Sequence, residues 1–389
     1  MRRARAGLIG AGFVGPLHVE AARRLGFVDF VALASSNAAT ARQKAKALHI
    51  PQAYSHYEEL LADDSIEVVH ICTPNDLHYP IVKDAILKRK HVICDKPLAL
   101  TAVQARELVE LAREAHIVNA VTFNYRFHPL IQQARAMIQK GELGELRFVH
   151  GGYWQDWLMY DTDFSWRLEP AKGGVSCAMG DIGSHWCDTA QFITGRRIKR
   201  VLAALSTIVP LRKKPVTRRE AFQAAADDER FDEYLVTSDD LGTVIFDFEG
   251  GVRGTFSVGQ ICPGHKNDLQ IEVNGARASL RWQQERPDEM WIGRRDAANS
   301  LLLRDASLLD SAAQRYANLP GGHSEGWADA FKNLLMSIYT FIAAGGDPVG
   351  APDNLDFPTF EDGYRANCIV DAIVRSNQDR SLWTAVEYE

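Results

Sequence analysis

Three side chains that can move protons or hold a ligand are spaced regularly within residues 173–195. Asp181, His185 and Asp188 stand at positions i, i+4 and i+7, which share one face of an α-helix. A histidine titrates near neutral pH, so this set can carry general acid–base catalysis. Two other interpretations stay open. His185 can be a satisfied core histidine, or it can join Asp181 in a metal site, although the ordinary zinc environment needs more ligands than D-x-x-x-H supplies.

A second chemical signal lies in residues 7–15, which read GLIGAGFVG. A short apolar run ending at Ile9 predicts a buried strand, and Gly10, Gly12 and Gly15 follow it in the spacing G-x-G-x-x-G. The first glycine permits a tight turn, the second lets the backbone approach a pyrophosphate, and the third lets a helix pack close to the strand. The helix N-terminus then offers free N–H groups to phosphates. We therefore predict a dinucleotide site, with cradle contacts from Gly10, Gly12, Phe13 and Val14.

Polar residues follow three further strand-like segments, where a parallel sheet binds its ligands. Lys96 alone would be interpreted as a solvated surface lysine. Its place after the buried run His91–Cys94, beside Pro97 with its fixed φ, favours a functional role instead. These loops should approach the nicotinamide end of the dinucleotide, and the contacts we expect there are Thr73, Pro74, Asn75, His78, Asp95, Lys96, Pro97 and Asn124.

The end of the second predicted strand bears on the choice between NAD and NADP. An acidic residue for the adenosine ribose of NAD is usual there, but this chain reads Ala34-Ser35-Ser36-Asn37, with Arg42 nearby. Serines with an arginine can accept the extra phosphate of NADP, and they can also tolerate NAD through neutral hydrogen bonds. The cofactor is therefore predicted as NAD or NADP, with contacts from Ser35, Ser36, Asn37 and Arg42.

The elements that position these loops alternate between strand and helix patterns, which is typical of a doubly wound parallel sheet. Thr101, followed by Gln104, predicts an N-cap with a capping-box partner. The predicted strands are Ala6–Ile9, Phe30–Ala34, Val68–Cys72, His91–Cys94 and Ile117–Thr122; the predicted helices are Leu17–Leu25, Ala39–Leu48, Tyr57–Ala62, His78–Lys88 and Ala102–Glu114.

From about residue 125 the pattern changes to longer strands, with tight turns at Gly250–Gly251 and Asn274–Gly275. Residues 211–233 are charged and predict an exposed excursion, and residues 321–344 and 360–376 are helical again. The strands expected here are Val201–Val209, Leu241–Phe248, Gly254–Ile261, Leu269–Val273 and Ala278–Trp282. Around His185, a core-facing stripe is expected from Ile182, Trp186, Thr189 and Ile193, with a helix stop at Gly195.

The fold class we expect is α/β, with two domains. Residues 1–124 form a Rossmann dinucleotide-binding domain. Residues 125–389 form an α+β domain with a large mixed or antiparallel open sheet, which binds substrate and mediates oligomerisation. The helix predicted at 360–376 would pack back on the Rossmann domain.

Composition excludes several classes of protein. A net charge of −6 argues against a general nucleic-acid binder. The six cysteines are scattered without a C-x-x-C pair, which argues against a disulfide framework or a zinc site and fits the cytoplasm. The basic N-terminus continues into the glycine turn, so we expect no export signal, and no apolar run is long enough for a membrane span.

One segment combines aromatic and polar side chains in a way that suits a sugar ring. Sugars have apolar C–H faces and hydroxyl edges, so tryptophans beside amide, carboxylate and guanidinium groups can bind them, although tryptophans more often fill cores. Residues 322–327, which include His323, can line the same pocket, with helix capping as the other role for His323. The contacts expected from these segments are Trp154, Gln155, Asp156, Trp166, Arg167 and His323.

Together, GAGFVG, TPNDLH, DKP, NYRFHP and DIGSH resemble the motifs of the Gfo/Idh/MocA oxidoreductase family across essentially the whole chain. The resemblance implies a catalytic lysine at Lys96 and a D-x-G-x-H pair at Asp181 and His185. Asp95 stands where the family usually has glutamate, which keeps the charge. Tyr125 and Arg126, within NYRFHP, complete the expected substrate contacts.

The activity implied by this resemblance is reversible hydride transfer between a nicotinamide and a hydroxyl of a sugar, anhydrosugar, glycoside or polyol. His185 is the best candidate base, Lys96 can stabilise the alkoxide, and Asp181 can orient His185; the first two roles are exchangeable. The alternatives are an NAD-dependent glycosidase using transient oxidation, and a non-enzymatic sensor. A homodimer or homotetramer through the second-domain sheet is expected as well.

Overall fold

The structure is a computed structural model that describes residues 2–216, 230–350 and 355–388. The chain forms two compact units. The first contains residues 1–123 and 331–367, and the second contains residues 124–330 and 368–389. The sequence pattern places residues 331–367 in the second domain, whereas the structure places them in the first unit. A sequence pattern shows that a helix has an apolar face, but not which core receives that face.

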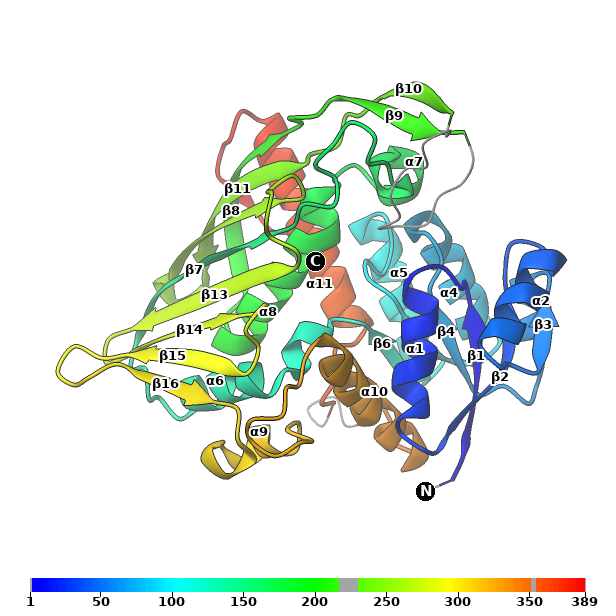
Figure 1. The fold of residues 1–389 in the computed structure, drawn as a ribbon, viewed down its shortest axis with the longest axis horizontal. Coiled ribbons are helices and arrows are strands. Elements are labelled where there is room, and N and C mark those ends of the chain that lie inside the picture. Colours follow the sequence, from blue (N-terminus) through cyan, green and yellow to red (C-terminus); the bar gives the residue numbers. More distant parts are fainter. Residues whose placement is uncertain (1, 217–229, 351–354, 389) are drawn as a thin grey trace. The chain divides into compact units, whose positions relative to one another are not determined.

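The first unit is built on a six-stranded parallel sheet in the order β3-β2-β1-β4-β5-β6 (Figure 1). This is the strand order of a Rossmann fold. The expected strands are present, and the short edge strand β3 was missed because three residues carry no readable pattern. The strands are β1 (Ala4–Ile9), β2 (Val28–Ala34), β3 (Gln52–Tyr54), β4 (Val68–Ile71), β5 (His91–Cys94) and β6 (Asn119–Val121).

Helices alternate with these strands, as the sequence predicts. Thr101 caps α5 by accepting from the backbone N–H of Gln104 at 3.2 Å. The reciprocal half of the capping box is not formed, because the Gln104 side-chain oxygen has no hydrogen-bond partner among the described residues. The helices are α1 (Val14–Arg23), α2 (Ala38–Ala47), α3 (Tyr57–Leu61), α4 (His78–Leu87) and α5 (Ala102–Glu114).

Two later helices, α10 (Trp327–Ala343) and α11 (Phe360–Gln378), also contribute to the first unit. The Tyr339 hydroxyl of α10 meets Nε2 of buried His70 on β4 at 2.7 Å. At the start of α11, the backbone N–H of Phe360 donates to the side chain of Asn119, and Asn367 donates to the carbonyl of Ala99. These contacts come from residues more than 200 positions apart, so local pattern does not predict them.

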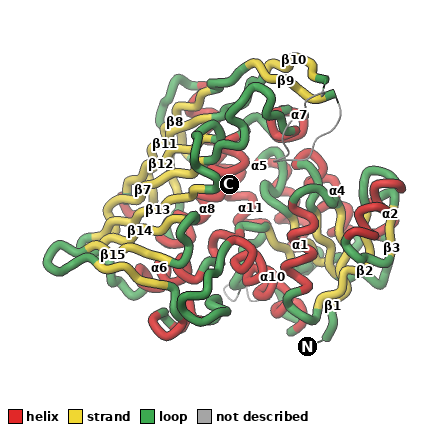
Figure 2. The backbone as a smooth tube through the Cα atoms, in the orientation of Figure 1, coloured by secondary structure: helices red, strands yellow, loops and turns green. Residues whose placement is uncertain are grey.

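The second unit is built on a nine-stranded sheet, drawn as adjacent yellow strands in Figure 2, in the order β16-β15-β14-β13-β7-β12-β11-β8-β17. Only β7 and β12 pair in parallel; the other neighbours are antiparallel. The predicted mixed sheet is therefore confirmed. The strands are β7 (Leu146–Trp154), β8 (Ile198–Ser206), β11 (Leu241–Phe248), β12 (Arg253–Gly259), β13 (Asp268–Gly275), β14 (Ser279–Gln283), β15 (Glu289–Gly293), β16 (Ser300–Leu303) and β17 (Thr384–Ala385).

Helix α8 (Ser184–Thr194) packs on this sheet through the predicted apolar stripe. The indole of Trp186 is fully buried and stacks on Phe256 and Phe246, with ring centroids 4.7 and 5.6 Å away. Gly195 ends the helix with φ +64°, as expected of a glycine C-cap. This packing fixes where the neighbouring His185 can lie.

Two turn predictions had different outcomes. Gly250 and Gly251 both have positive φ, at 73° and 77°, and turn the chain between β11 and β12. The turn expected at Asn274–Gly275 lies two residues later, at residues 276–277, because Gly275 still pairs in β13. Gly275 is needed for close approach instead: a Cβ there would lie 2.1 Å from the carbonyl oxygen of Leu143.

The charged excursion predicted at 211–233 is partly wrong. Residues 217–229 lie outside the described residues, but β9 (Leu211–Pro215) and β10 (Phe231–Leu235) form a two-stranded antiparallel sheet. Within it, the Arg212 side chain is fully buried and donates to the backbone carbonyls of Leu158, Tyr160 and Asp163. All three bonds come from Nη1, and the buried carboxylate of Asp240, 3.6 Å from Nη2, is the charge partner. Charge alone therefore misjudged the exposure of Arg212.

Two classes of feature are absent from the described part of the chain. No helix there is both long and apolar enough to cross a membrane. No group of three or more histidine, cysteine, aspartate or glutamate side chains is placed there to hold a metal ion.

Candidate active site

The glycine turn after β1 has the geometry of a dinucleotide cradle. Gly10 has φ +89°, and a Cβ there would lie 2.7 Å from the backbone of Cys72. A Cβ at Gly15 would lie 2.5 Å from the carbonyl oxygen of Gly10, so each of these glycines is required by the protein itself. At Gly12, by contrast, a Cβ would meet no described protein atom within 4 Å. The space beside Gly12 therefore fits a group that comes from outside the chain.

Helix α1 begins at Val14 directly after this turn, so its first N–H groups point to the same end of the sheet. Phe13 is half exposed at the start of the helix. The buried hydroxyl of Thr73, in the loop after β4, has no hydrogen-bond partner among the described residues. A glycine-rich turn, a helix N-terminus and a hydroxyl without a partner among the described residues, all at one edge of the sheet, together fit a pyrophosphate-linked cofactor.

His78 connects two of the loops at this edge of the sheet. Its side chain is fully buried, with Nδ1 2.7 Å from the carbonyl oxygen of Pro97 and Nε2 3.0 Å from that of Thr73. Burial lowers the pKa of His78, while the two carbonyl contacts act in the opposite direction. We expected His78 to contact the cofactor, but a fully buried ring instead ties the loop after β4 to the loop after β5.

Asp95 and Lys96 follow β5 at the same edge. The Asp95 carboxylate accepts a hydrogen bond of 2.5 Å from the hydroxyl of Thr122. Burial alone would raise the pKa of Asp95, but Lys96, His18 and this hydrogen bond outweigh it and hold the pKa below its usual value. An ionised Asp95 thus sits beside the half-buried Lys96, whose bond to Pro97 is cis.

The end of β2 carries no carboxylate, as the sequence indicates. Ser36 and Arg42 are exposed there and Ser35 is half-buried. The Asn37 side chain caps α2 by accepting from the backbone N–H of Thr40 at 2.9 Å. Asn37 therefore has a structural role that the prediction of a cofactor contact overlooked, and the two serines with Arg42 are the groups that remain for a ribose or its phosphate.

In the second unit, Asp181 lies in a π-helical turn, Met179–Gly183, that leads into α8. One carboxylate oxygen accepts from Nε of Arg167 and the other from Nε2 of Gln260, both at 3.0 Å. The Arg167 guanidinium lies over the ring of Trp166, 4.4 Å from its centroid. Two predicted substrate residues, Trp166 and Arg167, are therefore brought to Asp181, and Gln260 is a partner that the sequence did not reveal.

Buried Asp239 holds the start of this helical segment. Its carboxylate accepts from the backbone N–H groups of Cys177 and Met179, at 3.1 and 2.8 Å. Burial, the largest influence, raises the pKa of Asp239 against these hydrogen bonds. The π-helical turn also breaks the simple i, i+4, i+7 geometry expected for Asp181, His185 and Asp188.

Asp188 serves a different purpose from Asp181. It forms a two-point ion pair with Arg126, whose side chain is 13% exposed, against 4% for Asp188. Arg126 was expected to bind substrate. In the structure its Nε and one terminal nitrogen both donate to Asp188, and these bonds join the Asn124–Phe127 segment to α8. This ion pair gives the half-buried Arg126 a structural role, and its contact with substrate stays a prediction.

Tyr125, from the same short segment, is the centre of a buried polar network. Its hydroxyl lies 2.6 Å from that of Tyr153 and accepts from the Asn267 amide at 3.1 Å. The Tyr153 hydroxyl and the Gln155 amide donate to the Asn267 oxygen, at 2.5 and 2.9 Å. Burial raises the pKa of Tyr125 to about 12, so the network contains a neutral phenol.

The ring of Tyr125 meets the ring of His185 edge to face, with centroids 4.9 Å apart. His185 is 8% exposed. The predicted residues Tyr125, Gln155 and His185 are thus brought together, and Asn267 and Tyr153 complete the set. No local signal marks Asn267, because its importance comes from three partners on other segments.

The remaining predicted contacts lie in other surroundings, and two of them, Asp156 and Trp154, contact other residues of the chain. Asp156 pairs with Lys266 at 2.6 Å and accepts from the backbone N–H of Gly264; Lys266 and this N–H outweigh burial, so the pKa of Asp156 is lowered. The ring of Trp154 lies 5.7 Å from that of His265. The His323 side chain is exposed, and it does not cap α10, because Asp329 accepts the N–H of Gly326 there instead. Asn124, a predicted cofactor contact, is buried, with a side-chain nitrogen that has no acceptor among the described residues.

Comparison with known proteins gives this geometry its context. Residues 4–123 match the oxidoreductase family with an NAD-binding Rossmann fold, and residues 131–281 match the GFO/IDH/MocA C-terminal domain. Levoglucosan dehydrogenase from Pseudarthrobacter phenanthrenivorans is 30% identical over 99% of each chain. The chain belongs to the Gfo/Idh/MocA oxidoreductase family.

Solved structures agree with this assignment. An oxidoreductase domain protein from Kribbella flavida matches with a TM-score of 0.88 and 31% identity over 100% of both chains. A levoglucosan dehydrogenase in complex with NADH and levoglucosan matches with a TM-score of 0.87 and 26% identity, covering 99% of this chain and 100% of that one. This member of the family is an oxidoreductase that uses NAD or NADP, and the predicted fold class is confirmed.

Proposed function

We propose that the protein is a dehydrogenase that oxidises a hydroxyl of a sugar, anhydrosugar, glycoside or polyol with NAD or NADP. The observation that carries this proposal is the cluster in the second unit. There the ring of the nearly buried His185 contacts that of Tyr125, whose hydroxyl belongs to a network with Asn267 and Gln155. In the same unit, Asp181 is held by Arg167, whose guanidinium lies over the ring of Trp166. Such a set matches a ligand with both C–H faces and hydroxyl edges.

The chemistry requires the hydroxyl proton and a hydride to leave the same C–O–H unit. We assign proton acceptance to His185 and stabilisation of the developing alkoxide to Lys96, as an ammonium that donates to the reacting oxygen. Asp181, fixed by Arg167 and Gln260, would hold a neighbouring hydroxyl or orient His185. The nicotinamide, when bound, accepts the hydride.

The cofactor would be held by the glycine turn, the N-terminus of α1 and the loop after β4. In this proposal Gly12 and Val14 meet the pyrophosphate, and the orphaned hydroxyl of Thr73 finds its partner on the dinucleotide. Ser36 and Arg42 would bind the adenosine ribose or its phosphate, which leaves both dinucleotides acceptable.

The class of substrate is supported by the relatives. The levoglucosan dehydrogenase named above acts on an anhydrosugar and covers the full length of this chain. Trp166 and Arg167, stacked on each other beside Asp181, would supply the apolar and polar sides of a sugar subsite in the present protein.

We also propose that the chain assembles as a homodimer or homotetramer through the nine-stranded sheet. On neighbouring strands, Thr243 pairs in register with Ser257 and Ile245 pairs with Thr255, and these side chains are exposed or half-buried while Val244 and Phe256 between them are buried. Light scattering on the purified protein tests this, and a monomer at micromolar concentration would overturn it.

The experiment that tests the activity is a panel of anhydrosugars, aldoses, glycosides and inositols. Each is offered with NAD and with NADP, and the absorbance of reduced nicotinamide is followed. Turnover of at least one carbohydrate is the expected result. If the purified protein releases sugar from glycosides without net reduction of the nicotinamide, the dehydrogenase assignment is wrong.

A further inference from the structure

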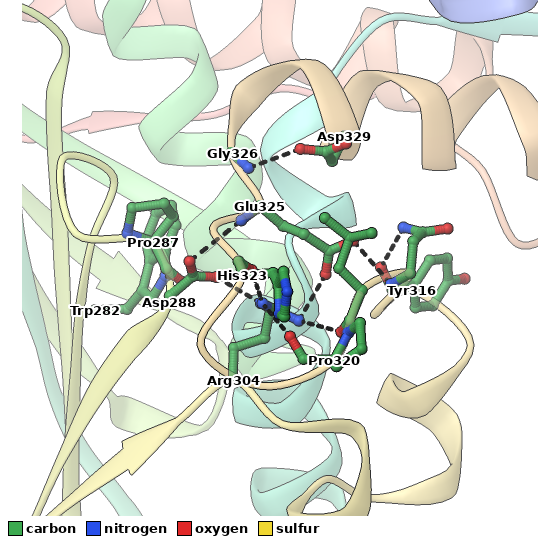
Figure 3. Close-up of polar contacts among 12 residues, drawn as sticks. Trp282, Pro287, Asp288, Arg304, Tyr316, Pro320, His323, Glu325, Gly326 and Asp329 are labelled. Carbon is green, nitrogen blue, oxygen red and sulfur yellow. Dashed lines mark hydrogen bonds and ion pairs between the residues drawn. The ribbon is translucent and has the colours of Figure 1, made fainter. Parts of the chain in front are cut away.

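A buried ionic cluster in the second unit is formed around Arg304, the residue directly after β16. Its side chain is only 1% exposed. Nε donates to Asp288 at 2.5 Å, and one terminal nitrogen lies 2.9 Å from a carboxylate oxygen of Glu325. Figure 3 shows Asp288 and Glu325 on either side of the guanidinium, with ion pairs drawn as dashed lines. Arg304 is therefore shared between two carboxylates.

Arg304 also binds the backbone of the loop that precedes α10. The same terminal nitrogen donates to the carbonyl of Leu319 at 2.8 Å, and the other donates to the carbonyl of His323 and, at 3.5 Å, to that of Pro320. The guanidinium thus has four hydrogen-bond acceptors and, in Glu325, one further ion-pair partner. A lysine has three donors and no planar fork, so it cannot reproduce this set.

Glu325 also holds this loop, residues 318–325, in place. One of its carboxylate oxygens accepts from the backbone N–H of Asn318 at 2.8 Å, and its own N–H donates to Asp288 at 3.2 Å. Glu325 is 2% exposed and Arg304 is its charge partner. Residues 318–325 are thus held at both ends to the end of β16 and to Asp288.

Two residues after Glu325, Trp327 begins α10. The side chain of Trp327 hydrogen-bonds to Tyr125. The ring of Tyr125 in turn contacts His185 edge to face. A shift of the loop would move Trp327 and release the phenol of Tyr125 from one of its donors. The cluster and the candidate active site are therefore connected through three successive contacts within one unit.

We propose that Arg304 is a positioning residue for the substrate site, acting through Glu325 and Trp327 on Tyr125 and His185. This inference rests on the proposed function for its kinetic consequence, but its structural part does not. In this proposal Arg304, with its side chain 1% exposed, acts through its neighbours and not by contact with the substrate or cofactor. It fixes the position of Trp327, which holds the Tyr125 ring against the imidazole of His185. In this way it determines the shape of the proposed sugar site.

The test uses the full-length protein with Arg304→Lys and Trp327→Phe, separately and together. Trp327→Phe keeps the ring and removes the N–H that Tyr125 receives. We expect each single variant to raise KM for the carbohydrate about tenfold, and the double variant to be no worse than the more impaired single one, because coupled residues are non-additive. Kd for the dinucleotide should stay unchanged. Additive effects of the two substitutions would overturn the proposal.

A spectroscopic readout makes the test independent of turnover. The chain has eight tryptophans, and Trp327→Phe identifies the indole N–H resonance of Trp327 in a nitrogen–proton correlation spectrum. Arg304→Lys should shift that resonance, whereas Arg281→Lys, at an exposed arginine on β14, should leave it in place. An unmoved resonance in Arg304→Lys contradicts the link. If no carbohydrate is turned over by the unmodified protein, the proposed function fails while this arm still decides on Arg304.

Glu325→Gln keeps the inference testable if Arg304→Lys does not fold, since depriving the buried carboxylate of Glu325 of its arginine is strongly destabilising. The glutamine amide oxygen still accepts from Asn318, while the amide NH2 replaces the carboxylate oxygen that faces Arg304, so the ion pair is lost and two donors meet there. The expected result is a smaller shift of the same indole resonance and a smaller rise in KM. An unchanged spectrum and KM in this variant would again contradict the proposal.

Discussion

The glycine cradle of the first unit and the polar cluster of the second unit are assembled in opposite ways. In the cradle, neighbouring residues supply the turn, the helix N-terminus and the open space, and Gly10 and Gly15 are fixed by contacts within a few residues or with the adjacent strand. In the cluster, Tyr125, Tyr153, Gln155 and Asn267 come from segments up to 142 positions apart. A motif can encode the first kind of site, whereas the second exists only once the sheet has formed.

The largest effect we expect would test whether one side chain at the edge of the cradle dominates the chemistry. Lys96→Ala should lower kcat about 10³-fold while Kd for the dinucleotide changes little, because the lost ammonium acts on the reacting oxygen. Steady-state kinetics and a fluorescence titration with reduced dinucleotide measure the two quantities. Lys88→Ala, at an exposed lysine after α4, is the matched control. Normal turnover in Lys96→Ala would remove this residue from the proposed mechanism.

The next prediction separates glycines that the fold needs from the glycine that the ligand needs. Gly12→Val should weaken dinucleotide binding about 100-fold, since two methyl groups would occupy the space meant for the pyrophosphate, yet the melting temperature should hold because no described atom lies near that Cβ. Gly10→Ala should instead lower the melting temperature, because its Cβ would overlap the backbone of Cys72. Calorimetric titration and thermal unfolding check the pair. Equal losses of stability in both variants would contradict this division.

A third prediction concerns the long-range packing around the cluster. His128 is fully buried, lies against Tyr125 and Trp282, and burial lowers its pKa from 6.5 to about 3. The unfolded chain therefore takes up the proton first, and stability should fall as pH drops below about 6.5. This one residue accounts for about 2 kcal/mol between pH 7 and pH 5, where the folded form stays neutral.

Denaturant unfolding at pH 7 and pH 5 measures this loss for the unmodified protein and for His128→Phe. The variant should lose about 2 kcal/mol less between the two pH values, although buried His18 and His70 retain their own contributions. His56→Gln, at an exposed site directly before α3, serves as control and should keep the original dependence. An identical slope in His128→Phe would show that this histidine is protonated in the folded protein.

The smallest effect that we expect concerns the end of β2, where the usual carboxylate is missing. Ser36→Asp should shift the ratio of kcat/KM for NAD over NADP at least about tenfold towards NAD, because a carboxylate accepts from ribose hydroxyls and repels a phosphate. Ser300→Asp adds the same charge on exposed β16 and should leave the ratio unchanged. A shift towards NADP in Ser36→Asp would mean that this serine lies away from the adenosine ribose.

Sequence patterns predicted the first unit well because its features are local. The alternation of strands and helices predicted the parallel sheet, and Gly10, Gly12 and Gly15 have the surroundings that their spacing indicates. Where local signals competed, the prediction was less accurate. Asn37 caps a helix, and His78 joins two loops from beneath the surface.

In the second unit, residue type identified the important segments but not the partners. Asp181 and Asp188 looked equivalent on one helical face, yet the π-helical turn and two arginines gave them different roles. Arg212, in the segment expected to be exposed, is fully buried, and the sequence carried no signal for the buried Arg304. Such outcomes depend on which backbone carbonyls and carboxylates a folded chain brings within reach.

The sequence by itself determined the dinucleotide fold, the family and the side chains able to carry oxidation of an alcohol, because those features repeat at fixed short spacings. Only the tertiary structure decided that Arg126 serves Asp188, that Asn267 joins two tyrosines, and that Arg304 secures the loop before α10. A buried charge or amide is stable only beside a suitable partner, and that partner can come from anywhere along the chain.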